Sequence, residues 1–184
     1  MQAHLPVVIV LAAGRSSRFR ASGGGGSKLH ADLDGMTVLE HVLAAVERSG
    51  LAVQLVEQAA GDAMGDSIAA GVNATRDAAG WLVLPGDLPL VGVDSIRSVA
   101  EALTNHSVAV PCYQGQKGHP VGFSRECRDA LLALAGEAGG AAVVSHYAAA
   151  GRVVKLDVDD PGIVTDIDTL EDLQRVRALL AASR

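Results

Sequence analysis

The run Val7-Val8-Ile9-Val10-Leu11 is the feature that most constrains the fold, because it is apolar at every position and rich in β-branched residues. A strand with one face in water would alternate apolar and polar residues, whereas a parallel strand covered by helices on both faces does not. No Lys or Arg precedes the run, so it lacks the positive region of a signal peptide. We therefore expect a buried parallel strand.

Strand-like and helix-like segments alternate along the rest of the chain. Further strands are expected over residues 53–56, 81–84, 108–110, 121–123 and 153–158. Helical patterns lie between them, and we expect Thr37, Ser67 and Asp94 to cap three of the helices. This order predicts an α/β fold, a three-layer sandwich with a mostly parallel, Rossmann-like sheet, built as a single domain over residues 1–184.

Composition narrows the class of partner. The chain has 184 residues, 49% of them hydrophobic, and a formal charge of -6 without a basic cluster, so we expect no nucleic-acid partner. The sequence has no apolar run of about 18 residues, the length that would predict a membrane span. Cys112 and Cys127 lack metal-ligand spacing and are expected to be reduced and packed in a cytoplasmic protein.

The loop from Gly14 to Lys28 is the first candidate site, because ligands of open α/β sheets bind outside the carboxyl ends of the strands. It combines five glycines with the cations Arg15, Arg18, Arg20 and Lys28, which suits a polyphosphate. The order Gly26-Ser27-Lys28-Leu29 does not match a P-loop, and no G-x-G-x-x-G pattern fits. The alternatives are a disordered surface loop and an engineered insertion.

Acidic residues after strand-like runs are the second candidate. Asp87 follows the run over residues 81–84, where a carboxylate can bind Mg²⁺ or simply belong to a turn. Asp166 and Asp168 alternate along a strand-like segment, so they are expected to point to opposite faces. One of them could then bind the ion while the other caps the last helix. His119, between Gly118 and Pro120, could contact a substrate or be merely structural.

Five segments, taken together and in order, resemble those of nucleotidyltransferases of the molybdenum cofactor cytidylyltransferase family and its relatives. They are Leu11-Ala12-Ala13-Gly14-Arg15-Ser16-Ser17-Arg18-Phe19 with Lys28-Leu29, Met64 to Gly71, Gly86-Asp87-Leu88-Pro89, Lys117 to Phe123, and Asp166 to Leu173. They cover nearly the whole chain.

The resemblance implies a role for each matching residue. Arg18, Lys28 and Asp87 would be catalytic, with Asp87 and Asp166 as ligands of Mg²⁺ and His119 against the substrate. The nucleotide would be held by Leu11, Ala12, Ala13, Gly14, Arg15, Ser67 and Gly86. Relatives that use GTP usually carry glycine where this chain has Ala13, which favours CTP.

The implied reaction transfers CMP from CTP to the phosphate of molybdopterin and releases pyrophosphate. Three alternatives remain: another phosphorylated acceptor such as a sugar or alditol phosphate, GTP as the donor, and a non-catalytic nucleotide-binding accessory protein of a molybdoenzyme. A molybdoenzyme is a further candidate partner. Arg20, Gly23 to Gly26 and Leu170 depart from the family pattern, and we expect the lengthened glycine loop to be slack and disordered without nucleotide.

Overall fold

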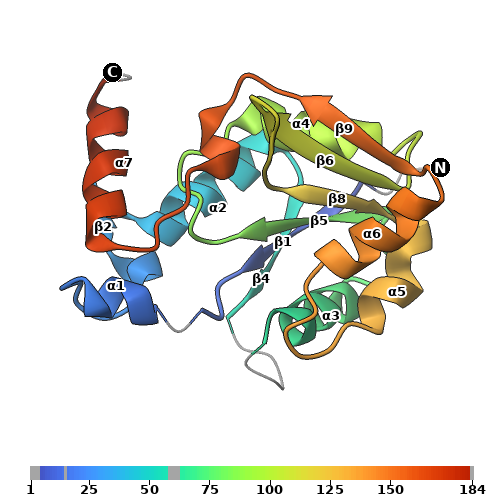
Figure 1. The fold of residues 1–184 in the computed structure, drawn as a ribbon, viewed down its shortest axis with the longest axis horizontal. Helices are drawn as coiled ribbons and strands as arrows, with labels where there is room; N and C mark the ends of the chain where they lie inside the picture. Colours follow the sequence, from blue (N-terminus) through green and yellow to red (C-terminus); the bar gives the residue numbers. More distant parts are fainter. Residues whose placement is uncertain (1–4, 15, 58–62, 183–184) are drawn as a thin grey trace.

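The computed structural model describes residues 5–14, 16–57 and 63–182, and it is an α/β structure (Figure 1). Its strands are β1 (Val7–Leu11), β2 (Asp32–Leu33), β3 (Met36–Thr37), β4 (Ala52–Val56), β5 (Gly80–Pro85), β6 (Val108–Tyr113), β7 (Gln116–Lys117), β8 (Val121–Ser124) and β9 (Val153–Asp157). Its α-helices are α1 (Ser17–Ala21), α2 (Val38–Ser49), α3 (Met64–Ala74), α4 (Val93–Ala102), α5 (Arg128–Leu132), α6 (Ala141–Ala149) and α7 (Leu170–Ala182). Short 3₁₀ turns η1 (Lys28–His30), η2 (Arg125–Cys127) and η3 (Pro161–Val164) complete it.

The central sheet is mostly parallel, as predicted. β1 lies between β4 and β5 and is parallel to both, with Leu11 opposite Val56 on one side and Pro85 on the other. β8 is antiparallel to β5 and β6, and β9 pairs in parallel with β6. The strands β4, β1 and β5 therefore end together, and the loops that follow them meet at one edge.

Helices cover both faces of the sheet, and the apolar run of β1 is buried on each. Val8 and Val10 pack with α2 and α4, whereas Ile9 packs with α3 on the opposite face. Figure 1 shows α2 and α4 on one side of the strands and α3, α5 and α6 on the other. These two cores explain why β1 carries no polar alternation.

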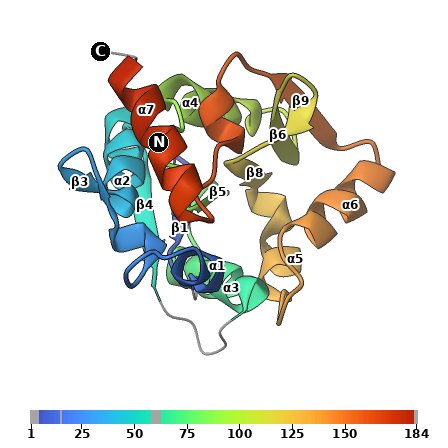
Figure 2. The same ribbon diagram turned by 60° about the vertical axis from the view of Figure 1, so that its left-hand side comes forward.

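Helix α7 stands at one end of the molecule, beside α1 and the β2–β3 hairpin (Figure 2). Leu173 and Val176 attach it to the core of α2. The guanidinium of Arg177 donates to the carbonyl of Asp32 over 2.7 Å. The segment just before α7, which carries Asp166 and Asp168, is thereby held next to the loops that follow β1 and β5.

Two predicted helix caps are wrong. Helix α3 begins at Met64, not at Ile68, and the hydroxyl of Ser67 lies within the helix and donates to the carbonyl of Ala63. Helix α4 has Gly92 rather than Asp94 as its N-cap. Thr37 does cap α2, where its side chain and that of Glu40 form a capping box.

In the described part of the chain, no helix has the length and apolar character needed to cross a membrane.

Candidate active site

Gly86 brings the ends of β1 and β5 into contact. Its amide donates to the carbonyl of Leu11 over 2.9 Å, and a Cβ at Gly86 would lie 3.0 Å from the same oxygen. A larger residue would push the two loops apart. Gly86 therefore places Asp87, the next residue, directly beside the Ala13–Gly14 end of the first loop.

A first cleft of about 270 Å³ opens at this edge of the sheet. Seven of the residues predicted for the site line it: Leu11, Ala13, Gly14, Lys28, Ser67, Gly86 and Asp87. The rest of its lining was not predicted and consists of Leu29, Ala63, Met64, Pro85 and Glu137. The cleft thus runs from the charged side chains of Lys28 and Asp87 to the start of α3.

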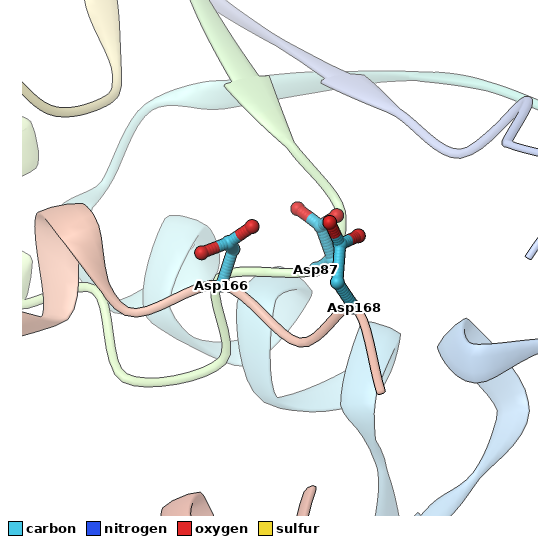
Figure 3. A group of neighbouring side chains, drawn as sticks. All are labelled: Asp87, Asp166 and Asp168. Atoms are coloured by element: carbon cyan, nitrogen blue, oxygen red, sulfur yellow. The ribbon is translucent and has the colours of Figure 1, made fainter. Parts of the chain in front are cut away.

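Three carboxylates converge at the charged end of the first cleft. The side chains of Asp87, Asp166 and Asp168 each offer one oxygen, and these oxygens lie within 4.8 Å of one another. Figure 3 shows the three side chains turned towards the same space, Asp87 after β5 and the other two on the segment before α7. The segment is not a strand, so the prediction that Asp166 and Asp168 point to opposite faces is wrong.

Lys28 and Arg18 neutralise part of this negative charge. The ammonium of Lys28 donates to Asp87 Oδ2 over 2.7 Å and to Asp168 Oδ1 over 2.6 Å. The guanidinium of Arg18 bonds the other oxygen of Asp168. Lys28 is 9% exposed, whereas the side chain of Arg18 is 77% exposed, so Lys28 carries the more desolvated charge.

The contacts change the proton affinity of both partners. Burial alone lowers the pKa of Lys28, but Asp87 and Asp168 outweigh it and hold the pKa above its usual 10.5. The hydrogen bond from Lys28, with help from Arg18, holds the pKa of Asp168 below its usual 3.8 although partial burial opposes this. Both groups are therefore charged at neutral pH.

Asp168 does not cap α7, contrary to one alternative from the sequence. Thr169 and Asp172 form a capping box instead: the Thr169 hydroxyl accepts from the Asp172 amide over 3.2 Å, and the Asp172 carboxylate accepts from the Thr169 amide over 2.9 Å. The Asp168 amide also donates to Asp172. The cap therefore leaves the Asp168 side chain available to Lys28 and Arg18.

The glycine-rich loop has a defined shape in the structure, whereas its disorder in the absence of nucleotide stays a prediction. It contains α1, and the amides of Gly23 and Gly24 donate to the carbonyls of Arg20 and Phe19. A Cβ at Gly24 would lie 2.2 Å from the ring of Phe19, which is 2% exposed. The Ser22 hydroxyl accepts from the Leu170 amide, so the loop also contacts the start of α7.

The hydroxyl of Ser16 fixes the two ends of this loop. It accepts a hydrogen bond from the Lys28 amide over 3.1 Å. Next to it, the Ser27 hydroxyl accepts from the Leu29 amide and caps the turn η1 that begins with Lys28. The backbone of Lys28 is therefore held in place by Ser16, whereas its side chain is held by Asp87 and Asp168.

A second cleft of about 340 Å³ adjoins the first, with which it shares Leu11, Met64 and Pro85. His119 lines this second cleft and not the first. Burial holds the pKa of His119 below its usual 6.5, although Asp87 and Asp166 oppose the shift. The imidazole is therefore largely neutral at pH 7 and lies close enough to the aspartates to feel their charge.

Among the described residues, three further predicted ones line neither cleft: Ala12, Arg18 and Asp166. Ala12 lines a separate hollow with Glu57, and its amide donates to Val56. Arg18 contacts the site through the carboxylate of Asp168. Arg15 falls outside the described residues.

Similar solved structures are nucleotidyl transferases and related proteins. One from Methanothermobacter thermautotrophicus has a TM-score of 0.81 at 20% identity, over 98% of this chain and 99% of its own. Molybdopterin-guanine dinucleotide biosynthesis protein A from Archaeoglobus fulgidus has a TM-score of 0.64 at 16% identity, over 96% of this chain and 99% of its own. Rv0371c from Mycobacterium tuberculosis, solved as a manganese complex, has a TM-score of 0.70 at 24% identity, over 95% of this chain and 98% of its own. At these identities the likeness shows the fold.

A search of curated proteins found no match. A family model, in contrast, matches residues 8–56 and 48–151, which is most of the chain. Its matched region includes β1, the glycine-rich loop, Lys28, Asp87 and His119, and ends before the segment that carries Asp166 and Asp168. The chain belongs to the MobA-like NTP transferase domain family.

Proposed function

We propose that this protein transfers a nucleotidyl group from a nucleoside triphosphate to the phosphate of a small molecule and releases pyrophosphate. The observation that carries the proposal is the joint position of Lys28, Asp87, Asp166 and Asp168 beside a cleft that adjoins a second cleft. The first cleft would hold the nucleotide, and the second cleft would hold the acceptor. Lys28 and the three carboxylates would then lie where the nucleotide and the acceptor meet.

The three carboxylates suit a divalent cation such as Mg²⁺. Mg²⁺ prefers oxygen ligands at about 2.0–2.1 Å, so two ligands of one ion lie at most about 4.2 Å apart. The limit of 4.8 Å for the present oxygens is close to this and needs only a small adjustment of side chains. The manganese complex of the related fold supports a divalent cation in general. Asp87, Asp166 and Asp168 would hold the cation, whose charge would neutralise the negative charge that develops during transfer.

This chain's own residues would supply the rest of the transition-state stabilisation. A phosphate monoester with a second pKa of about 6 is already largely ionised at neutral pH, so its attack needs no general base. The attacking oxygen would approach the α-phosphorus in line, and the pyrophosphate oxygen would leave on the opposite side. Lys28 and Arg18 would stabilise the leaving pyrophosphate through their charges.

The donor nucleotide is proposed to be CTP. Ala13 lines the first cleft, and its methyl group takes up space that the glycine of GTP-using relatives would leave open. A pyrimidine base requires less space than a purine. Leu11, Gly14, Ser67 and Gly86, which also line the first cleft, would complete the contacts to the nucleotide. The family resemblance adds Ala12 and Arg15 to this proposed set.

The acceptor is proposed to be molybdopterin. The second cleft is mainly apolar, with Ile68, Val121, Phe123 and Val144 among its walls. Such walls suit a ring better than the hydroxyl groups of a sugar, because unpaired hydroxyls are costly to bury. His119, and Lys117 as the one Lys or Arg among the described residues of the lining, would contact the polar end of the acceptor. A molybdoenzyme that receives the product is a further proposed partner.

A pyrophosphate-release assay tests these assignments. CTP, GTP and ATP are each combined with molybdopterin and with a panel of sugar and alditol phosphates, in the presence of Mg²⁺. The proposal expects the fastest release for CTP with molybdopterin. If pyrophosphate is released with a sugar phosphate but not with molybdopterin, the proposed acceptor is wrong. If it is released with GTP but not with CTP, the proposed donor is wrong. Nucleotide binding without any release would instead favour an accessory protein.

A further inference from the structure

Lys28 connects two of the three carboxylates by itself. Its ammonium lies 2.7 Å from Asp87 Oδ2 and 2.6 Å from Asp168 Oδ1. The second oxygen of Asp168 is bonded by Arg18, so both oxygens of this carboxylate already have a cationic partner. A positive charge thus lies between Asp87 and Asp168 without any added ion.

A divalent cation that bridged Asp87 Oδ2 and Asp168 Oδ1 would compete with the Lys28 ammonium for the same space. Mg²⁺ would lie about 2.0–2.1 Å from each of them, in the space between the carboxylates where the ammonium lies. Two positive charges at such a separation would also repel each other strongly in a partly buried site. Binding of a cation across Asp87 and Asp168 therefore requires Lys28 to move.

The side chain of Lys28 can move, but it needs a new partner. Its backbone is fixed by the hydrogen bond to Ser16, whereas its four-carbon stem can rotate. The residue is 9% exposed, so an unpaired ammonium would lose solvation without compensation. The first cleft, which Lys28 lines, is the direction in which a triphosphate would offer that partner.

We propose that the side chain of Lys28 has two positions. Without ligands its ammonium lies between Asp87 and Asp168, and when a divalent cation binds there the side chain turns towards the triphosphate. The proposal rests on the metal site of the proposed function. The lysine then acts as an internal competitor of the cation. A cation alone must break two ion pairs of Lys28, whereas a cation with nucleotide replaces them by contacts to phosphate.

This exchange makes the binding of cation and nucleotide cooperative. Each ligand removes part of the cost that the other would meet, and the coupling is the same from either side. If Lys28 kept its position between Asp87 and Asp168 when the ligands bind, its removal would raise the affinity for the cation by the same factor with and without nucleotide. The two accounts therefore differ in whether the effect of the nucleotide on cation affinity depends on Lys28.

The test measures Mn²⁺ binding by electron paramagnetic resonance in the wild type, in Lys28→Met and in Lys155→Met. Methionine matches the lysine stem as far as Cε and removes the charged group. Lys155, on the edge strand β9, is a matched control. Each protein is titrated alone and with a CTP analogue that has a methylene group between the α- and β-phosphates.

We expect Lys28→Met to bind Mn²⁺ alone roughly tenfold more tightly than the wild type, because a competing charge has been removed. In the wild type and in Lys155→Met, the analogue should increase the affinity for Mn²⁺. In Lys28→Met this increase should be smaller. Equal Mn²⁺ affinities of the wild type and Lys28→Met would overturn the exchange and leave the proposed transfer reaction intact. Absence of Mn²⁺ binding in every protein, with or without the analogue, would overturn the metal site itself.

A measurement on the wild-type protein covers the case in which Lys28→Met does not fold. The ¹⁵N and ¹H signals of the Lys28 ammonium are observable by NMR when the group is held in ion pairs. They should shift or broaden on addition of Mg²⁺ with the analogue. An unchanged Lys28 signal at Mg²⁺ concentrations that saturate the site would contradict the exchange.

Discussion

The amide of Ile167 donates a hydrogen bond of 3.0 Å to the carbonyl oxygen of Asp87. Ile167 is fully buried, and the residues on either side of it are Asp166 and Asp168. One backbone contact thus anchors the segment before α7 to the loop after β5. Because of it, three carboxylates that are distant in the sequence lie around one point (Figure 3).

Replacement of Asp87 by Asn should reduce cation-dependent turnover by about 10²-fold or more, the size of effect seen when one oriented charge-stabilising group is removed. The fold should persist, because Lys28 keeps its contact with Asp168. Pyrophosphate release and thermal unfolding measure the two effects. Asp159→Asn, at an exposed position, is the control and should match the wild type. Near-wild-type turnover of Asp87→Asn would exclude Asp87 as a ligand of the cation.

Gly24→Ala should destabilise the glycine-rich loop, whereas Gly25→Ala should not. The added methyl at position 24 would lie 2.2 Å from the buried ring of Phe19, whereas the methyl at position 25 meets nothing within 4 Å. Overpacking of this kind costs about 1–3 kcal/mol. Thermal unfolding and CTP binding of the two variants test the contrast. If both variants bind CTP like the wild type, the loop's shape is irrelevant to the nucleotide.

Loss of the cap of α7 should affect both stability and the site. Thr169→Ala removes the hydroxyl that accepts from the Asp172 amide, and loss of a cap costs about 0.5–2 kcal/mol. Thr37→Ala removes the equivalent hydroxyl of α2, remote from the carboxylates. We expect similar losses in chemical denaturation, but weaker Mn²⁺ binding only in Thr169→Ala. Unchanged Mn²⁺ affinity there would show that Asp168 is positioned without the cap.

His119 should make the protein less stable in mild acid. Burial holds its pKa below 6.5 in the folded protein, so between the two pKa values the unfolded chain binds a proton that the folded protein does not. The free energy of unfolding should therefore fall as pH drops below about 6.5 and stop falling below the folded pKa.

Denaturation curves of the wild type and His119→Gln between pH 4 and 8 measure this contribution. The difference between the two proteins should change over that range, while exposed His106→Gln should follow the wild type at every pH. Parallel pH profiles of the wild type and His119→Gln would mean that His119 has the same pKa in both states.

Much of the fold could be predicted from local patterns. The run over residues 7–11 predicted β1, and Thr37 predicted the start of α2, because these signals lie within or directly beside the elements themselves. The start of α3 was missed since its N-cap, Ala63, has no capping side chain. The start of α4 was missed because Asp160, from a distant loop, accepts a hydrogen bond from the Gly92 amide.

The site could be predicted only in part, because some of its contacts come from segments that are distant in the sequence. Loops at the carboxyl ends of β1 and β5 were expected to meet, and Lys28 does contact Asp87. The place of Asp168 depends on the Ile167 contact and on the cap at Thr169, neither of which the alternation of residues reveals. Glu137 lines the first cleft because the loop before α6 packs on α3, where Gly65 donates to Gly136. No local pattern marks Glu137 as part of the cleft.

Label transfer from CTP tests the central claim most directly. Two samples of CTP, one labelled with ³²P at the α-phosphate and one at the γ-phosphate, are incubated with the protein, Mg²⁺ and molybdopterin, and the products are separated. Nucleotidyl transfer predicts the α label on the acceptor and the γ label in pyrophosphate, both absent in Asp87→Asn. Transfer of the γ label to the acceptor, or no transfer of either label while CTP binds, would contradict the account.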